Sequence, residues 1–188
     1  ACRRLTGLIT NILKLNKLEN QQIFPETKEF DLDTQLSECI IRLDNVLERK
    51  DLEVEADMEE RVKVKSDEEL LDLVWNNLLS NAIKFTPPGG KITVSLKSDN
   101  TMAVIKISDT GCGISNEVGK RMFEKFYQGD SSHATQGNGL GLALVKRVVD
   151  IVGGDISIES KLGEGSTFTV RLKKIPSGGR GNQSSPEK

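Results

Sequence analysis

Apolar and polar residues recur along the chain at two different periods, which predict where helices and strands form. Apolar positions three and four residues apart predict helices over 3–19, from Asp33 to about Lys50, over Asp67–Phe85 and over Leu140–Val152. A period near two predicts strands, and these are expected at 29–32, 52–56, 61–65, 91–97, 102–108, 155–160 and 166–172. This mixed order favours the α+β class: a two-layer α/β sandwich with a mixed, mostly antiparallel sheet covered on one face by helices, plus an N-terminal amphipathic helix.

Local breaks divide the chain into three parts. Pro25 separates the first helix from the rest of the chain, because a proline disfavours helix at the residue before it. Ser66 with Glu69 forms the pattern of a capping box and is expected to open the helix over Asp67–Phe85. The tail is rich in glycine and serine and is expected to be disordered. We therefore expect a leading helix over 1–24, one domain over 25–174 and a tail over 175–188.

Charge and composition exclude several classes of protein. Lysine and arginine number 26 against 28 aspartates and glutamates, a net charge of −2, which argues against neutralising a nucleic-acid backbone. No apolar run reaches the ~18 residues of a membrane span. The three cysteines form no CxxC pair, and the one histidine, His133, excludes a paired-histidine metal motif. These observations favour a soluble protein of the reducing cytosol.

A polar edge runs along the helix over Asp67–Phe85. Asn77, Asn81 and Lys84 fall within an arc of about 60° at ~100° per residue, beside the apolar face of this helix. Amide oxygens suit a hard cation such as Mg²⁺, and an ammonium suits phosphate oxygens. A solvated edge of an ordinary helix is the alternative interpretation.

Two glycine-rich segments and one aromatic segment are further candidates. Asp109–Ile114 follows a predicted strand, where glycines permit close approach to a ligand; a tight turn is the alternative. Gly137–Leu142 leads into a helix whose free N–H groups could face phosphate, although a flexible hinge has the same pattern. Met122–Tyr127 carries aromatic residues suited to anchoring in the core, and the polar stretch between it and Gly137 is a candidate lid.

In this order the four segments resemble the catalytic, ATP-binding domain of sensor histidine kinases, one of the Bergerat-fold ATPases. The matches are the N box at 77–86, the first G box at Asp109–Ile114, the F box at Phe123–Tyr127 and the second G box at Gly137–Leu142. The resemblance covers about Phe30 to Leu172, so it implies the Bergerat fold for most of the chain.

The resemblance also implies roles for the phosphate half of the site, with ATP and Mg²⁺ as cofactors. Asn81 would hold Mg²⁺, supported by Asn77, while Lys84 would contact phosphate oxygens. Lys125 would approach the γ-phosphate and, with Asn77, is the candidate for a catalytic role. The second G box would close over the phosphates through Gly137, Gly139, Leu140, Gly141 and Leu142.

The base half of the site is implied by the same resemblance. Asp109 would accept a hydrogen bond from the adenine amino group, and Gly113 would let the base lie against the backbone. Thr167 would join the adenine site through water. Further candidates to contact ATP are Gly111, Ile114, Phe85 and Tyr127.

Residues 3–19 are similar to the second helix of the dimerisation and phosphotransfer hairpin that precedes this domain in the family. The first helix of that hairpin carries the phosphoacceptor histidine in an H-E-x-x-x-P context, which the sequence lacks, so a fragment beginning midway through the hairpin is expected. The expected partners are the missing half of the hairpin and a response-regulator receiver domain, but no nucleic acid. A homodimeric parent is expected. The chain itself is expected in the cytoplasm, and membrane anchoring of the parent stays open.

The implied activity is that of a protein histidine kinase, which passes the γ-phosphoryl group to a histidine and then to a regulator's aspartate. Hydrolysing relatives carry a glutamate where this chain has Asn77, and an amide cannot act as a general base. Gln128 stands where many relatives have an arginine after the F-box tyrosine, which favours Lys125 as the residue that neutralises the γ-phosphate. The alternatives are an anti-sigma-type serine/threonine kinase and a non-catalytic nucleotide-sensing module; the helix over 3–19 counts against the former, and the intact N and G boxes oppose the latter.

Overall fold

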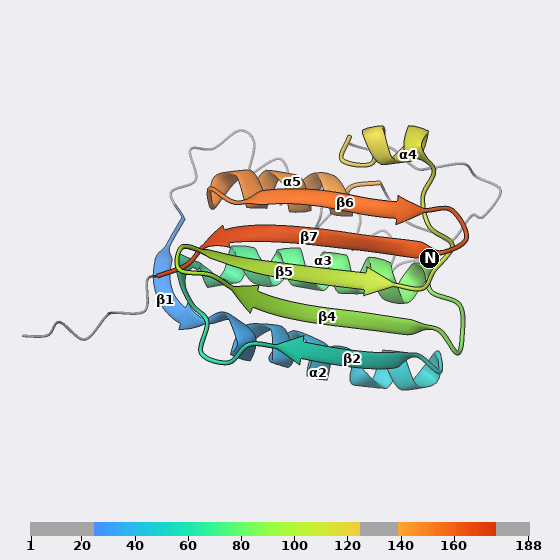
Figure 1. Cartoon of the computed structure of the whole chain (residues 1–188), viewed down its shortest axis with the longest axis horizontal. Helices are drawn as coiled ribbons and strands as arrows, with labels where there is room; N and C mark the ends of the chain where they lie inside the picture. Colours follow the sequence, from blue (N-terminus) through green and yellow to red (C-terminus); the bar gives the residue numbers. More distant parts are fainter. Residues whose placement is uncertain (1–24, 125–138, 176–188) are drawn as a thin grey trace, which may run out of the picture.

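A five-stranded sheet with helices on one face forms the centre of a computed structural model that describes residues 25–124 and 139–175 (Figure 1). The strand order is β2-β4-β5-β7-β6, in which β2 and β4 run parallel and every other neighbouring pair is antiparallel. Short strands β1 and β3 form a separate antiparallel pair. The elements are β1 (Thr27–Asp31), α2 (Leu32–Arg49), β2 (Glu53–Met58), β3 (Lys63–Asp67), α3 (Glu68–Phe85), β4 (Lys91–Ser98), β5 (Met102–Asp109), α4 (Asn116–Arg121), α5 (Gly141–Ile151), β6 (Asp155–Lys161) and β7 (Gly165–Lys173).

The two faces of the sheet differ in polarity. Alternate side chains of β4, β5 and β7 point toward α2, α3 and α5 and are buried, because a strand directs successive side chains to opposite faces. They meet the apolar side of α3, where the Trp75 ring is completely buried. The opposite face carries mostly serine, threonine and charged residues. This two-layer arrangement confirms the predicted fold class, while the helix expected over 3–19 and the tail from 176 lie outside the described residues.

A buried hydrogen-bond pair fixes the start of α3 against α2. The Trp75 indole Nε1 donates to Gln35 Oε1 at 2.8 Å, and Gln35 Nε2 donates to the Glu68 carbonyl at 2.7 Å. Both polar ends of the glutamine amide are thereby satisfied in the core, as burial requires. The pair sets the position of the helix that carries the N-box residues.

The cap of α3 differs from the prediction. Asp67, not Ser66, is the N-cap, and its carboxylate accepts from the Leu70 N–H at 3.0 Å. The reason is that β3 stays paired with β1 through Asp67, so the helix begins one residue later than the capping-box pattern indicates. Ser66 lies within the strand, and its Oγ is buried without a hydrogen-bond partner in the described part of the chain.

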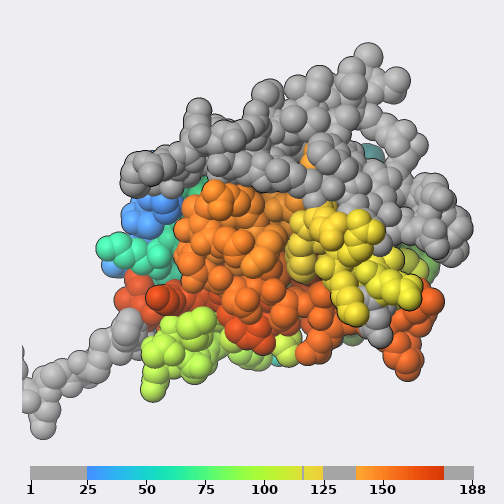
Figure 2. Space-filling model, turned by 90° about the horizontal axis from the view of Figure 1, so that it is seen from above, coloured from blue at the N-terminus to red at the C-terminus, as the bar shows by residue number. Residues whose placement is uncertain are grey.

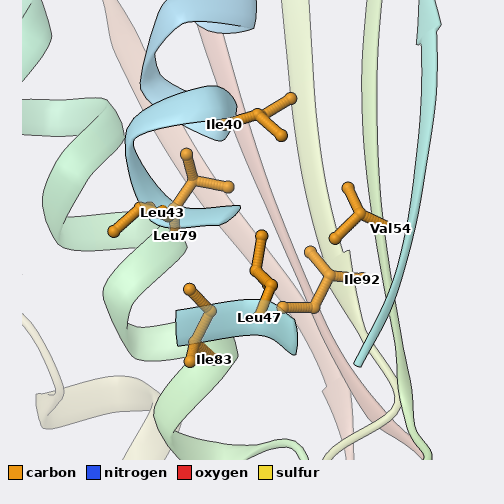
Figure 3. Close-up of a pocket in the computed structure, with 7 residues that line it drawn as sticks. All are labelled: Ile40, Leu43, Leu47, Val54, Leu79, Ile83 and Ile92. Carbon is orange, nitrogen blue, oxygen red and sulfur yellow. The ribbon is translucent and has the colours of Figure 1, made fainter. Parts of the chain in front are cut away.

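A small apolar cavity lies between α2, α3 and the edge of the sheet formed by β2 and β4 (Figure 3). Its volume is about 10 Å³, which corresponds to one water-sized sphere. Aliphatic side chains line it, so it offers no polar group to a ligand. The lining residues are Ile40, Leu43, Leu47, Val54, Leu79, Ile83 and Ile92.

The short helix predicted near 117–126 is α4, which ends at Arg121. It contacts β6, and from above it lies next to the surface that α5 and β6 form (Figure 2). Among the helices of residues 25–124 and 139–175, none has the length and apolar character that a membrane-spanning segment needs.

Candidate functional site

Three of the predicted motifs meet beside the C-terminal half of α3. A Cβ placed on Gly111, in the loop after β5, would lie 2.6 Å from the Phe85 carbonyl oxygen. A Cβ placed on Gly141, at the start of α5, would lie 2.9 Å from Asn77 Oδ1. Glycine thus lets the backbone at Gly111 approach that of Phe85, and the backbone at Gly141 approach the Asn77 side chain. The N box and parts of both G boxes therefore form one region of the molecule.

Asp109 ends β5 on the helix-covered face of the sheet. Its Oδ1 accepts from the Gly111 N–H at 2.8 Å, and the backbone N–H of Ser166 also donates to the carboxylate. Burial raises the pKa of Asp109, since the loss of hydration outweighs these two hydrogen bonds. A carboxylate held in this way by backbone groups is preorganised to accept a hydrogen bond from an amino group.

Thr167 lies on the other face of the sheet and does not share a surface with Asp109. It is the register partner of Ser108, and its Oγ1 donates to Ser108 Oγ at 2.9 Å. Asp109 pairs instead with Ser166, whose side chain is buried on the same face. Strand alternation therefore places Ser166, and not Thr167, on the face of the sheet that Asp109 occupies.

The loop over Asp109–Ile114 is fixed to the end of β6 and to the turn between β6 and β7. The Ile114 N–H donates to Ser160 Oγ at 2.8 Å, and the Gly163 N–H donates to the Cys112 carbonyl at 2.7 Å. Gly113 has a φ of +66°, and a Cβ there would lie 2.0 Å from the Lys161 carbonyl oxygen. Sequence reasoning did not find Ser160, because no motif distinguishes it from other strand serines.

Replacing Gly165 with alanine is expected to destabilise the protein by about 2–4 kcal/mol. Gly165 has a φ of +113°, and a Cβ there would lie 1.9 Å from the Asp109 carbonyl oxygen, so both the backbone conformation and the space exclude a side chain. Urea denaturation would measure the loss. Gly153→Ala is the control, since Gly153 has a φ of +71° but no atom within 4 Å of its Cβ position. Equal losses in the two variants would contradict the role of the contact with Asp109.

The two amides on the polar edge of α3 differ in their hydrogen bonding. Asn77 Nδ2 donates to the Leu73 carbonyl at 2.7 Å, which leaves Oδ1 facing Gly141. The half-buried Asn81 amide has no hydrogen-bond partner within the described residues. Its free oxygen fits a hard cation, although residues 25–124 and 139–175 contain no cluster of His, Cys, Asp or Glu that could hold a metal ion alone. An ion at Asn81 would need further oxygen ligands from a bound molecule.

Lys84 and Phe85 lie together at the end of α3. The Lys84 Nζ is 4.4 Å from the centroid of the Phe85 ring, within the range of a cation–π contact. Burial lowers the pKa of Lys84, and no carboxylate of the described residues forms an ion pair with it. The Phe85 side chain is 40% exposed. This end of the helix thus presents an ammonium group and an apolar ring surface.

The start of α5 supplies backbone donors. Leu140 is the N-cap, and in the described part of the chain no side chain caps this end and no acidic residue occupies the first turn. The first N–H groups of a helix have no intrahelical partner and carry a partial positive charge, which suits an anion. Gly139 and Gly141 border this end, Leu140 is buried in the core, and Leu142 packs against it. Lys125, Tyr127 and Gly137 lie outside the described residues.

Comparisons with known proteins identify the family of this chain. Residues 66–176 match the family described as histidine kinase-, DNA gyrase B-, and HSP90-like ATPase. The chain is 37% identical over 174 residues to the sensor-like histidine kinase SenX3 of Mycobacterium tuberculosis, covering 92% of this chain and 42% of SenX3. It is 37% identical over 171 residues to the circadian input-output histidine kinase CikA of Synechococcus elongatus, covering 88% of this chain and 23% of CikA. The chain thus spans less than half the length of either relative.

Solved structures share the fold. The mycobacterial sensor histidine kinase MprB aligns with a TM-score of 0.69 at 29% identity, covering 80% of this chain and 99% of that one. Full-length ShkA aligns with a TM-score of 0.81 at 24% identity, covering 93% of this chain and 37% of that one, a likeness of fold. The chain therefore belongs to the histidine kinase-, DNA gyrase B- and HSP90-like ATPases, and its described domain is an ATPase domain of the sensor histidine kinase type.

Proposed function

We propose that this domain binds Mg-ATP and presents the γ-phosphoryl group to a histidine, as the catalytic part of a two-component sensor kinase. The main observation that supports this proposal is Asp109, a buried carboxylate at a strand end that two backbone N–H groups hold in place. The adenine amino group donates a hydrogen bond to the Asp109 carboxylate, which can accept more than the two backbone bonds. Ser166 borders the base in place of Thr167. Gly111, Gly113 and Ile114 form the backbone wall of this half of the site.

The phosphates extend from the base toward α3 and the start of α5. Lys84 contributes a positive charge, and the N–H groups around Gly139, Leu140, Gly141 and Leu142 contribute hydrogen-bond donors. Asn81 would hold Mg²⁺ through its amide oxygen, and the ion would neutralise charge on the phosphate oxygens. Lys125, Tyr127 and Gly137 are proposed to complete the site from outside the described residues.

Phosphoryl transfer is favoured over hydrolysis by the chemistry of Asn77. Its amide cannot remove a proton from water, and its Nδ2 is already bonded to the Leu73 carbonyl. In transfer, a neutral imidazole nitrogen of the acceptor attacks the γ-phosphorus, the bond to the bridging oxygen breaks, and ADP leaves. The domain contributes position and positive charge, while the acceptor histidine supplies the nucleophile.

The parent protein is proposed to act with a response regulator and as a homodimer. One supporting finding is the structure of the histidine kinase ThkA in complex with the response regulator protein TrrA, which shares the fold with a TM-score of 0.78 at 22% identity. The structure of ShkA was solved in complex with AMPPNP, an ATP analogue. A phosphotransfer hairpin that carries the acceptor histidine is the partner proposed to deliver it.

Calorimetric titration of the 188-residue chain with AMPPNP, with and without Mg²⁺, tests the nucleotide site. Micromolar affinity that Mg²⁺ strengthens is expected, and absence of binding would overturn the assignment. Joining a complete hairpin to the chain and adding labelled ATP tests transfer. Acid-labile, base-stable phosphate on the hairpin histidine is expected, whereas release of free phosphate alone would contradict a transfer function.

A further inference from the structure

The C-terminal end of α3 cannot form the usual backbone cap. Helices commonly end with N–H groups of the two residues after the C-cap, which donate to carbonyls two and three residues before the cap. The C-cap of α3 is Thr86, and the next two residues are Pro87 and Pro88, which have no N–H. The two carbonyls that this cap would satisfy, those of Ile83 and Lys84, therefore need donors from elsewhere.

Lys50 supplies these donors from a different element. Its Nζ donates to the Ile83 carbonyl and, at 2.9 Å, to the Lys84 carbonyl. The neighbouring Ala82 carbonyl accepts from Thr86 through both its N–H, at 3.0 Å, and its Oγ1, at 2.6 Å. A cation at this position also complements the negative end of the helix dipole. One side chain thus replaces the missing cap of the N-box helix.

Backbone hydrogen bonds hold the segment around Lys50 against the loop after α3. The Gly89 N–H donates to the Asp51 carbonyl at 2.7 Å, and the Glu53 N–H donates to the Gly90 carbonyl at 2.9 Å. Lys50 itself is half-buried as the C-cap of α2. The ammonium is therefore mounted on a fixed segment and is not the free end of a mobile side chain.

We propose that Lys50 is a positioning residue for the phosphate half of the nucleotide site, an inference that rests on the proposed function. Through the Ile83 and Lys84 carbonyls it keeps the last turn of α3 helical. That turn carries Lys84 and follows Asn81 directly, so its geometry sets where the ammonium and the amide oxygen lie. In the base half, β5 and β7 hold Asp109 and Ser166, although Gly111 approaches the Phe85 carbonyl of this turn. The effect of Lys50 is therefore larger for ligands that carry phosphates than for adenosine alone.

The test compares AMPPNP, whose phosphates are expected to depend on the end of α3, with adenosine, which has no phosphates. Lys50→Met is expected to weaken binding of AMPPNP with Mg²⁺ about tenfold, which corresponds to a change of ~1.4 kcal/mol. Binding of adenosine, followed by chemical-shift changes, is expected to change less than about twofold, because its contacts are with the Asp109 side. Lys50→Arg keeps a charged donor and should bind AMPPNP within about threefold of the unmodified chain.

Lys65→Met removes a lysine charge from an exposed position on β3 and serves as the matched control. If Lys50→Met does not fold, Lys50→Gln carries the same expectation, since its side chain is uncharged and one bond too short to place a donor where Lys50 Nζ lies. Equal weakening of both ligands, or unchanged AMPPNP binding, would overturn the positioning role while leaving the proposed function standing. Failure of the unmodified chain to bind either ligand would overturn the proposed function and this inference together.

Discussion

Asp109→Asn is expected to weaken binding of an ATP analogue by at least about 100-fold, or ~2.7 kcal/mol. Backbone N–H groups of Gly111 and Ser166 already donate to the carboxylate, so an amide NH₂ would face a donor from the backbone or the adenine amino group. One of these donors would then stay unpaired in a buried place, which is costly. Calorimetric titration of the variant measures the loss.

Acidity provides an independent check on Asp109. Burial raises the pKa of Asp109 above the ordinary 3.8. As pH is lowered, the carboxylate therefore takes up a proton, and analogue binding by the unmodified chain should weaken, at a pH above 3.8. A raised pKa also means that stability from this group is lost as pH rises through the folded-state pKa. The variant should therefore unfold no more easily at neutral pH.

The control for Asp109→Asn is Asp57→Asn, the same chemical change at an exposed position of β2 that pairs with Lys97 at 2.6 Å. Its analogue affinity is expected to match that of the unmodified chain. Retained affinity in Asp109→Asn, or equal losses in both variants, would contradict the assignment of Asp109 to the base.

Asn81→Ala is expected to remove the Mg²⁺ dependence of nucleotide binding. With Mg²⁺ present, affinity for AMPPNP should fall about 10- to 100-fold, toward the value that the unmodified chain shows in EDTA. Without the ion, the two proteins should bind alike, because the Asn81 amide oxygen contributes through the metal. Titrations of both proteins in each condition measure this difference.

Asn76→Ala is the matched control on the same helix. The Asn76 amide donates to the Asp72 carbonyl and carboxylate at 2.8 and 2.7 Å, which ties it to its own helix. Its loss should leave the Mg²⁺ effect unchanged. If Asn81→Ala retained a full Mg²⁺ effect, the ion would have to be held elsewhere.

The fold was predictable where one period dominates a segment. The alternation through β4, β5 and β7 and the apolar stripe of α3 specify buried faces, because burial strongly constrains which side chains point inward. The end of a strand is less constrained. The pairing of Thr27 with Asp67 extends β3 past the residue that the local capping pattern indicates, and only a partner distant in sequence determines this.

The candidate site shows the same division. The order of the motifs predicts Asn77, Asn81, Lys84 and Asp109 as site residues, and these stay predictions. Thr167 lies one position from Ser166, the residue beside Asp109. Register between β5 and β7 determines which serine or threonine faces inward, and short polar side chains leave no hydrophobic signal to reveal it. Lys50 was also missed, because its role depends on two prolines that come after another helix.

The parallel pairing of β2 with β4 has a consequence for how the domain assembles. Two adjacent parallel strands need a long crossover connection, and here that crossover contains the N-box helix itself. The edge strand β2 reaches its register with β4 only when α3 lies across the sheet. The topology therefore couples the pairing of β2 with β4 to formation of the phosphate half of the site. A ligand that holds the helix in place therefore stabilises a strand that it does not touch.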